Sequence, residues 1–127
     1  MMAPISVSCA HPAASRWQGL SGPCGYCYPC LIRRASMHVV GPDNGAEYVV
    51  DILTDADFLN SASTKPASLR ATLAAIRHPS RSTDILRNGP APIDDLAALA
   101  ALQARGLAEL KAWLRTARAQ PILDLLP

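Results

Sequence analysis

Four cysteines lie within the first 30 residues, at Cys9, Cys24, Cys27 and Cys30. The last three form an unbroken Cys-x-x-Cys-x-x-Cys motif, and thiolates at such spacing are typical ligands of zinc or of an iron–sulfur cluster. Cysteines three residues apart in a tight turn or an early helical turn can direct their sulfurs toward one point. Cys9 can supply the fourth sulfur by closing a loop over residues 10–23.

The spacing predicts a structural zinc site made by these four cysteines. Four protein ligands leave no open coordination position, so the ion is expected to stabilise the fold and not to catalyse. Gly22 and Gly25 fit this prediction because the backbone has to turn sharply around an ion. Three alternatives stay open: His11 in place of Cys9, an iron–sulfur cluster, and disulfides or free thiols.

A helix is expected to begin near Pro29 and to end before Gly41. The sulfurs then lie near the positive end of the helix dipole, which favours thiolates. Arg33 and Arg34 follow about one turn later. We expect them to offset thiolate charge or, together with Arg16, to contact an anionic group of a substrate or a nucleic acid.

The composition predicts a mainly α fold, a small zinc-stapled module of a zinc knuckle and three to four helices. Half of the residues are hydrophobic, yet only 5% are aromatic, and alanine and leucine dominate. We expect a zinc-binding loop and helix over 1–41, an acidic connecting segment over 42–63, a helical region over 64–121 and a C-terminal tail over 122–127.

Two helices are predicted in the helical region. The first has Thr64 as its cap and one apolar stripe at Leu69, Leu73 and Ile76. A short turn capped by Ser82 or Thr83 follows. The second runs from Pro92 to Pro121, and its predicted apolar face consists of Leu96, Leu99, Leu102, Leu107, Leu110, Trp113 and Leu114. We expect both stripes to be buried in the core, and a docking surface for a partner is the alternative.

Charge is distributed in blocks although the net charge is only +2. Residues 42–60 contain five acids and no base, whereas residues 61–89 contain five bases and the single acid Asp84. We expect the acids to be solvated or to pair with the basic block. A second metal site made from Asp51, Asp55 and Asp57 is the alternative, although no glycine-centred calcium loop accompanies them. The run Tyr48–Leu53 is expected to form a short strand or the start of a helix.

The cysteine segment resembles a known zinc segment. Ser8-Cys9 and Cys24-Gly25-x-Cys27-x-x-Cys30-Leu31-x-Arg33-Arg34 are similar to the C-terminal part of 7-cyano-7-deazaguanine synthases, the QueC family, over about residues 7–38. The strings around His11 and Trp17, with the run from Pro29 to Arg34, look like the QueC-like group of the Qat anti-phage system (QatC). The resemblance implies structural zinc at the four cysteines.

Enzymes of that family attach ammonia nitrogen to 7-carboxy-7-deazaguanine at the expense of ATP. Their ATP-binding loop, of the Ser-Gly-Gly-x-Asp-Ser type, offers backbone amides to phosphate. The nearest string here is Ser21-Gly22-Pro23, in which proline removes an amide donor. The family's α/β nucleotide-binding portion is missing too. We therefore expect a C-terminal fragment, a truncated gene product or one piece of a split protein, inactive alone.

A protein partner is expected, either the missing ATP-binding portion or another component, and a homo-oligomer is a further option. No apolar run approaches 18 residues and no secretory signal is present, so we expect a cytoplasmic protein without a membrane span. The alternative function is a free-standing zinc module that binds nucleic acid, with stacking rings at Trp17, Tyr26 and Tyr28. The small net charge disfavours it.

Overall fold

The computed structural model describes residues 8–11, 19 and 22–127. This part of the chain is helical and contains no strand, which confirms the mainly α prediction. Its α-helices are α2 (Tyr28–Val40), α3 (Ala67–Arg77), α4 (Leu96–Leu114) and α5 (Gln120–Leu125). Shorter 3-10 segments connect them: η2 (Gly45–Glu47), η3 (Phe58–Asn60), η4 (Ser82–Asn88) and η5 (Ile93–Asp95).

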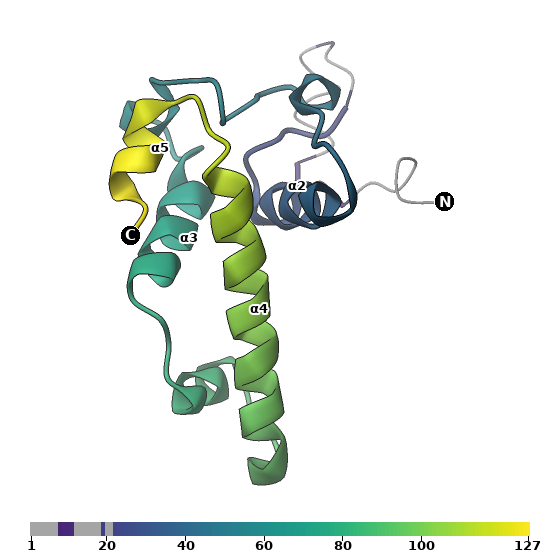
Figure 1. The fold of residues 1–127 in the computed structure, drawn as a ribbon, viewed down its shortest axis with the longest axis vertical. Helices are drawn as coiled ribbons and strands as arrows, with labels where there is room; N and C mark the ends of the chain where they lie inside the picture. The colour runs from purple at the N-terminus through teal and green to yellow at the C-terminus, as the bar shows by residue number, and fades with distance from the viewer. Residues whose placement is uncertain (1–7, 12–18, 20–21) are drawn as a thin grey trace.

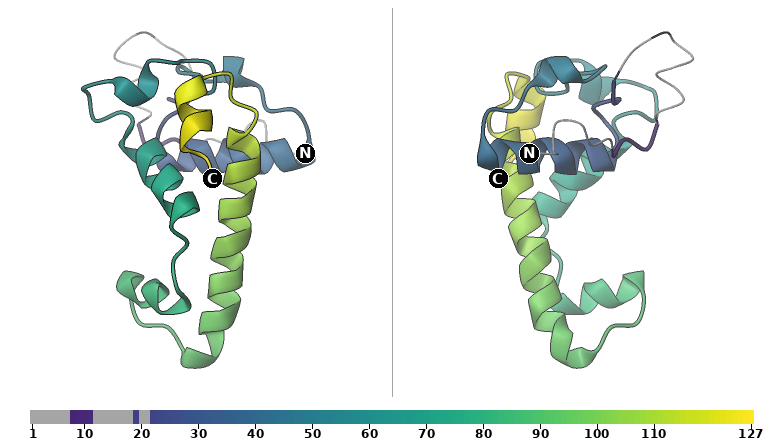
Figure 2. Two further views of the ribbon diagram at one scale, coloured as in Figure 1. Left: turned by 60° about the vertical axis from the view of Figure 1, so that its left-hand side comes forward. Right: turned by 90° about the vertical axis from the view of Figure 1, so that its right-hand side faces the viewer.

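Helix α4 is the axis of the molecule (Figure 1). Helix α2 packs across its C-terminal half, α3 lies beside it, and α5 folds back near α3. The N-terminal half of α4 extends beyond α2 and α3, and η4 lies alongside that half (Figure 2). None of the described helices is both long and apolar enough to cross a membrane.

The core lies where α2, α3, α5 and the C-terminal half of α4 converge. Trp113 and Leu114 of α4, Leu31 of α2 and Leu69 of α3 are fully buried there. The stripe predicted for α3 is confirmed, because Leu69, Leu73 and Ile76 all face this core. Burial of such side chains contributes about 1.5–3 kcal/mol each.

The segment before α3 differs from its prediction. Tyr48–Leu53 forms neither a strand nor a helix, because its backbone bonds to two other parts of the chain instead. The Val50 N–H donates to the carbonyl of Cys24 (3.0 Å), and the carbonyl of Leu53 accepts from the N–H groups of Arg118 and Ala119 (2.8 and 2.9 Å). The segment therefore links the cysteine region to the turn between α4 and α5.

The helix starts and ends also differ in detail. Thr64 does not cap α3 through its side chain; its carbonyl accepts the N–H of Ala67 (3.1 Å), and Pro66 precedes the helix. The helix predicted from Pro92 begins at Leu96 after a 3-10 turn and ends at Leu114. Helix α5 then forms across Pro121, where the sequence predicted the end of the helical region.

The prediction of one buried face along α4 is wrong for its N-terminal half. Leu110, Trp113 and Leu114 are buried, but Leu99 is 36% and Leu102 is 57% exposed. The physical reason is that α2 and α3 lie against the C-terminal half only (Figure 2). A helix with apolar residues along its whole length thus has one half in the core, whereas its other half is only partly covered, by the 3-10 segments η4 and η5.

A pair of matched substitutions in α4 tests this division. Leu110→Ala is expected to lower the free energy of unfolding by about 2–4 kcal/mol, because it leaves a cavity in the core. Leu102→Ala removes the same atoms from a solvent-exposed position and is expected to change the free energy of unfolding by less than about 0.5 kcal/mol. Urea unfolding of both variants measures the difference, and equal losses would contradict the arrangement.

Candidate metal centre

The four cysteines converge on one point although Cys9 is distant from the others in sequence. All four Sγ atoms lie within 4.8 Å of one another. Cys24, Cys27 and Cys30 are buried, Cys9 is half-buried, and all four are free thiols. Cys27 immediately precedes α2 and Cys30 lies in its first turn. The predicted clustering of these sulfurs is therefore confirmed, and the cluster can hold one metal ion.

Backbone N–H groups surround the sulfurs and support negative charge on them. The N–H of Cys24 donates to Cys9 Sγ (3.3 Å), and the N–H of Cys27 donates to Cys24 Sγ (3.4 Å). The N–H groups of Ala10 and His11 donate to the sulfurs of Cys27 (3.4 Å) and Cys9 (3.3 Å). Hydrogen bonds to the charged form of an acid stabilise that form, so this environment suits thiolate ligands.

Gly25 allows the backbone to pass closely around the sulfurs. Its φ is +88°, a conformation that side chains disfavour, and a Cβ at this position would clash with the carbonyl oxygen of Val50. Gly22 has a φ of +106° and would bring a Cβ to 2.9 Å from the carbonyl oxygen of Glu47. Both glycines are thus required by turn geometry and by close packing against residues 47–50.

The thiols interact strongly with one another. Cys24 Sγ and Cys30 Sγ lie 3.9 Å apart and share a hydrogen bond. This bond lowers the pKa of Cys24 to about 3 despite the opposing effect of burial. The same bond, together with burial, raises the pKa of Cys30 above its usual range, and burial raises the pKa of Cys27. A cation bound between the sulfurs would replace the shared proton and compensate all the thiolates.

His11 lies close to the cluster without belonging to it. Its Nδ1 is 3.8 Å from Cys24 Sγ, and its ring stacks on Tyr26 at 5.6 Å between centroids. Within the described residues, the group whose donor atoms all lie within 4.8 Å consists of cysteines alone. This geometry favours Cys9 over His11 as the fourth ligand.

Arg34 does not face a ligand, which corrects its predicted role in anion contact. The side chain is 1% exposed, and its guanidinium lies between the rings of Tyr48 and Trp113, 4.9 and 5.0 Å from their centroids. Its Nε and Nη2 donate to Asp43 Oδ2 (2.9 and 2.6 Å), and its Nη1 donates to Asp51 Oδ1 (2.8 Å). The side chain has no surface left for an external anion.

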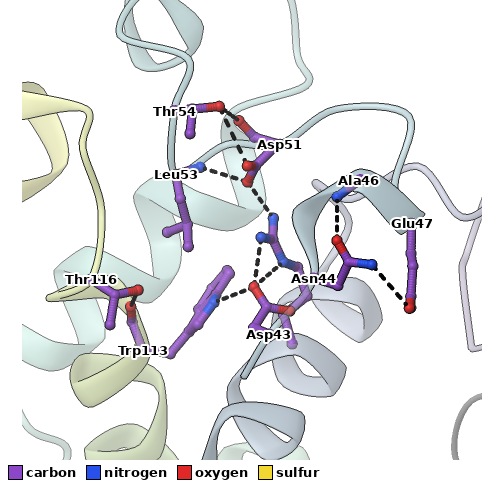
Figure 3. Close-up of polar contacts among 10 residues, drawn as sticks. Asp43, Asn44, Ala46, Glu47, Asp51, Leu53, Thr54, Trp113 and Thr116 are labelled. Atoms are coloured by element: carbon purple, nitrogen blue, oxygen red, sulfur yellow. Dashed lines mark hydrogen bonds and ion pairs between the residues drawn. The ribbon is translucent and has the colours of Figure 1, made fainter. Parts of the chain in front are cut away.

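The carboxylates around Arg34 outweigh the cost of its burial. Desolvation alone would lower the pKa of Arg34, but the hydrogen bonds and charge of Asp43, followed by those of Asp51, raise it. The indole N–H of Trp113 also donates to Asp43 Oδ2 (3.1 Å). Figure 3 shows the side chains of Asp43, Asp51 and Trp113 meeting around one centre. We call Arg34, Asp43, Asp51 and Trp113 the arginine cluster.

The other predicted contact residues have different surroundings. Arg33 is half-buried and donates a hydrogen bond to the side chain of Tyr48. Tyr26, a predicted stacking ring, packs between His11 and Phe58. Arg16 and Trp17 lie outside the described residues. The described residues thus do not bring Arg33 and Arg34 together as one anion site.

The arginine cluster was not found by sequence reasoning. Asp43 and Asp51 were expected to be solvated or to pair with the basic block, and Trp113 was assigned to an apolar face. Asp43 and Trp113 are 70 residues apart. No local pattern reports a contact over that separation, and the surplus of acids in residues 42–60 was its only trace.

No family model, curated protein or solved structure matches this chain. The chemistry of the site is therefore judged from its own donor atoms. Four sulfurs from two separate stretches of chain, three of them buried, form a closed set of soft ligands. Such a set binds an ion without leaving a position for a substrate.

Substitution of Cys9 and of His11, one at a time, tests which of the two residues is the fourth ligand. Cys9→Ser is expected to weaken metal binding at least about 100-fold, because one of four thiolates is lost. His11→Ala is expected to weaken binding only about tenfold, because it removes an outer contact to Cys24 Sγ and no ligand. Competition titration with a coloured zinc chelator measures both affinities. A loss in His11→Ala equal to that in Cys9→Ser would exclude the four-sulfur site.

Neighbouring arginines provide a matched test of the arginine cluster. Arg34→Lys keeps the charge but cannot bridge two carboxylates or stack between two rings, so we expect a loss of about 2–4 kcal/mol in unfolding free energy. Arg33→Lys is expected to cost less than about 1 kcal/mol. Thermal and urea unfolding measure both. Similar small losses would show that Arg34 is not a central support.

Proposed function

We propose that the four cysteines hold one structural Zn²⁺ ion, and that the ion organises a helical interaction module. In a tetrahedral site with Zn–S bonds of about 2.3 Å, neighbouring sulfurs are about 3.8 Å apart. The separation of 3.9 Å between Cys24 and Cys30, and the limit of 4.8 Å for all pairs, suit this geometry. The convergence of the four sulfurs is the observation that carries the proposal.

Zinc would join the first described residues to the core. The stretch 8–11 contacts the turn before α2 through bonds between backbone N–H groups and cysteine sulfurs. In the same turn, the carbonyls of Pro23 and Cys24 accept hydrogen bonds from the N–H groups of Val49 and Val50 (2.9 and 3.0 Å). Tyr48, in the same segment, covers both the cysteine cluster and Arg34. Binding of the ion would thus stabilise a connected set of contacts that ends in the core.

The interaction surface would be the exposed apolar half of α4 and the adjoining groove. Gln103 is the only polar residue in 96–104, and a helix with apolar residues on all sides is normally buried. Tyr28 and Ile32 of α2 are 45% and 44% exposed beside it. The groove between α2 and α4 is lined by Tyr28, Ile32, Ala35, Ser36, Ala75, Gln103, Gly106, Leu107, Glu109 and Leu110. Exposed apolar patches of this kind mark contact sites for other proteins.

The resemblance over residues 7–38 suggests the identity of the partner. We propose an ATP-binding portion of a QueC-like assembly, which this chain would complete and which would act in 7-deazapurine chemistry or anti-phage defence. The cysteine segment supports the kinship, and the exposed face of α4 supports the need for a partner. The module would then serve the assembly through structure and not through catalysis of its own.

Elemental analysis and metal removal test the zinc site. We expect one zinc per chain and a melting temperature lowered by about 10–15 °C after chelation, because about 4 kcal/mol of binding free energy is lost. Circular dichroism should show reduced helicity that returns with Zn²⁺. Iron with labile sulfide would show a cluster in place of zinc. Absence of stoichiometric metal, or an unchanged stripped protein, would refute the proposal.

Photo-crosslinking tests the partner surface. A photoreactive residue in place of Leu102 is expected to form a discrete adduct with an ATP-binding partner in cells of the source organism, identified by mass spectrometry. The same residue in place of Arg115, which directly follows the core end of α4, serves as the control. An adduct with a second copy would indicate a homo-oligomer instead. No adduct specific to position 102 would refute this surface.

A further inference from the structure

A second pocket lies between α3 and the end of α5, away from the cysteine cluster. Its volume is about 200 Å³, and it is lined by Arg70, Leu73, Ala74, Arg77, His78 and Leu125. Figure 1 shows the end of α5 beside α3 at this place. Two arginines and a histidine therefore share one pocket with three apolar side chains.

Arg70 is held in place by neutral groups, so its charge is not compensated. Its Nη2 donates to the carbonyl of Leu59 and to that of Ser61 (3.3 Å). Arg77 lies seven residues further along the same helix, two turns away and on the same face. Arg77 and His78 are exposed, and none of the described ion pairs involves these three residues.

The ion pairs of the molecule explain why this pocket stays positive. The acidic block 42–60 was expected to pair with the basic block 61–89, but its Asp43 and Asp51 pair with Arg34 instead. Asp84, the single acid of the basic block, forms an ion pair with Arg87, with 3.8 Å between Oδ1 and Nε. Asp124 of α5 accepts a hydrogen bond from Gln120 (2.8 Å). None of the ion pairs in the described chain thus compensates the charge of Arg70 or Arg77.

We propose that this pocket binds the phosphate monoester group of a small molecule. Arg77 can donate two parallel hydrogen bonds to phosphate oxygens, and Arg70 can donate from Nε and Nη1, which the two carbonyls do not use. The two positive charges match the double negative charge of a monoester. Leu73, Ala74 and Leu125 would contact the apolar body that carries the phosphate. Arg70 is already oriented by two carbonyls, so little of its conformational entropy would be lost on binding.

Titration of the zinc-loaded protein with phenyl phosphate tests the proposal. Amide shifts in two-dimensional NMR are expected to change in α3 and at the end of α5. Inorganic phosphate should bind more weakly because it lacks the apolar body, and phenol should not bind because it lacks the charge. Arg77→Gln is expected to weaken phenyl phosphate binding about tenfold or more, and Arg77→Lys less than Arg77→Gln.

Arg105→Gln is the matched control, because it removes one charge from an exposed arginine outside the pocket. It is expected to leave the affinity within about twofold at about 0.15 M salt. Equal weakening by Arg105→Gln and Arg77→Gln would show nonspecific attraction and overturn the proposal. Shifts spread over the whole basic surface, or phenol binding as tightly as phenyl phosphate, would overturn it as well. The result does not depend on the identity of a protein partner.

Discussion

The structure depends on one buried cation and the two carboxylates that match it. A guanidinium with 1% exposure is tolerable only when its charge and its N–H groups are paired, and Asp43 and Asp51 supply the partners. Because these residues come from α2 and the segment after it, the pairing fixes that segment against the helix. The bond from Trp113 to Asp43 adds α4 to the same centre. Helix α2, the segment after it and α4 are thus held together around the charge of Arg34.

The cysteine cluster and the arginine cluster act on the same helix. Cys30 and Arg34 are four residues apart on α2, hence on one face, and both are buried. Tyr48 joins them, since it packs with the cysteines and lies over the guanidinium. An ion at the sulfurs and a salt bridge one turn away would therefore stabilise each other.

Pairing within the arginine cluster also determines what remains available at the surface. Once Asp43 and Asp51 bind Arg34, they cannot neutralise the arginines of α3. Similarly, once the C-terminal half of α4 fills the core, α2 and α3 do not cover its N-terminal half. The unmatched charge and the uncovered apolar face are both consequences of the way these contacts are distributed.

The sequence by itself determined the local features: the group of clustered cysteines, the helix after Pro29, the stripe of α3 and the mainly helical class. These follow from spacing and propensity, which act over a few residues. Tertiary structure decided the roles of Arg34, Asp43 and Asp51, the conformation of Tyr48–Leu53, and which half of α4 is buried. Charge pairing and burial depend on segments that are up to 70 residues apart in the sequence. A local pattern therefore does not show which residues will be in contact.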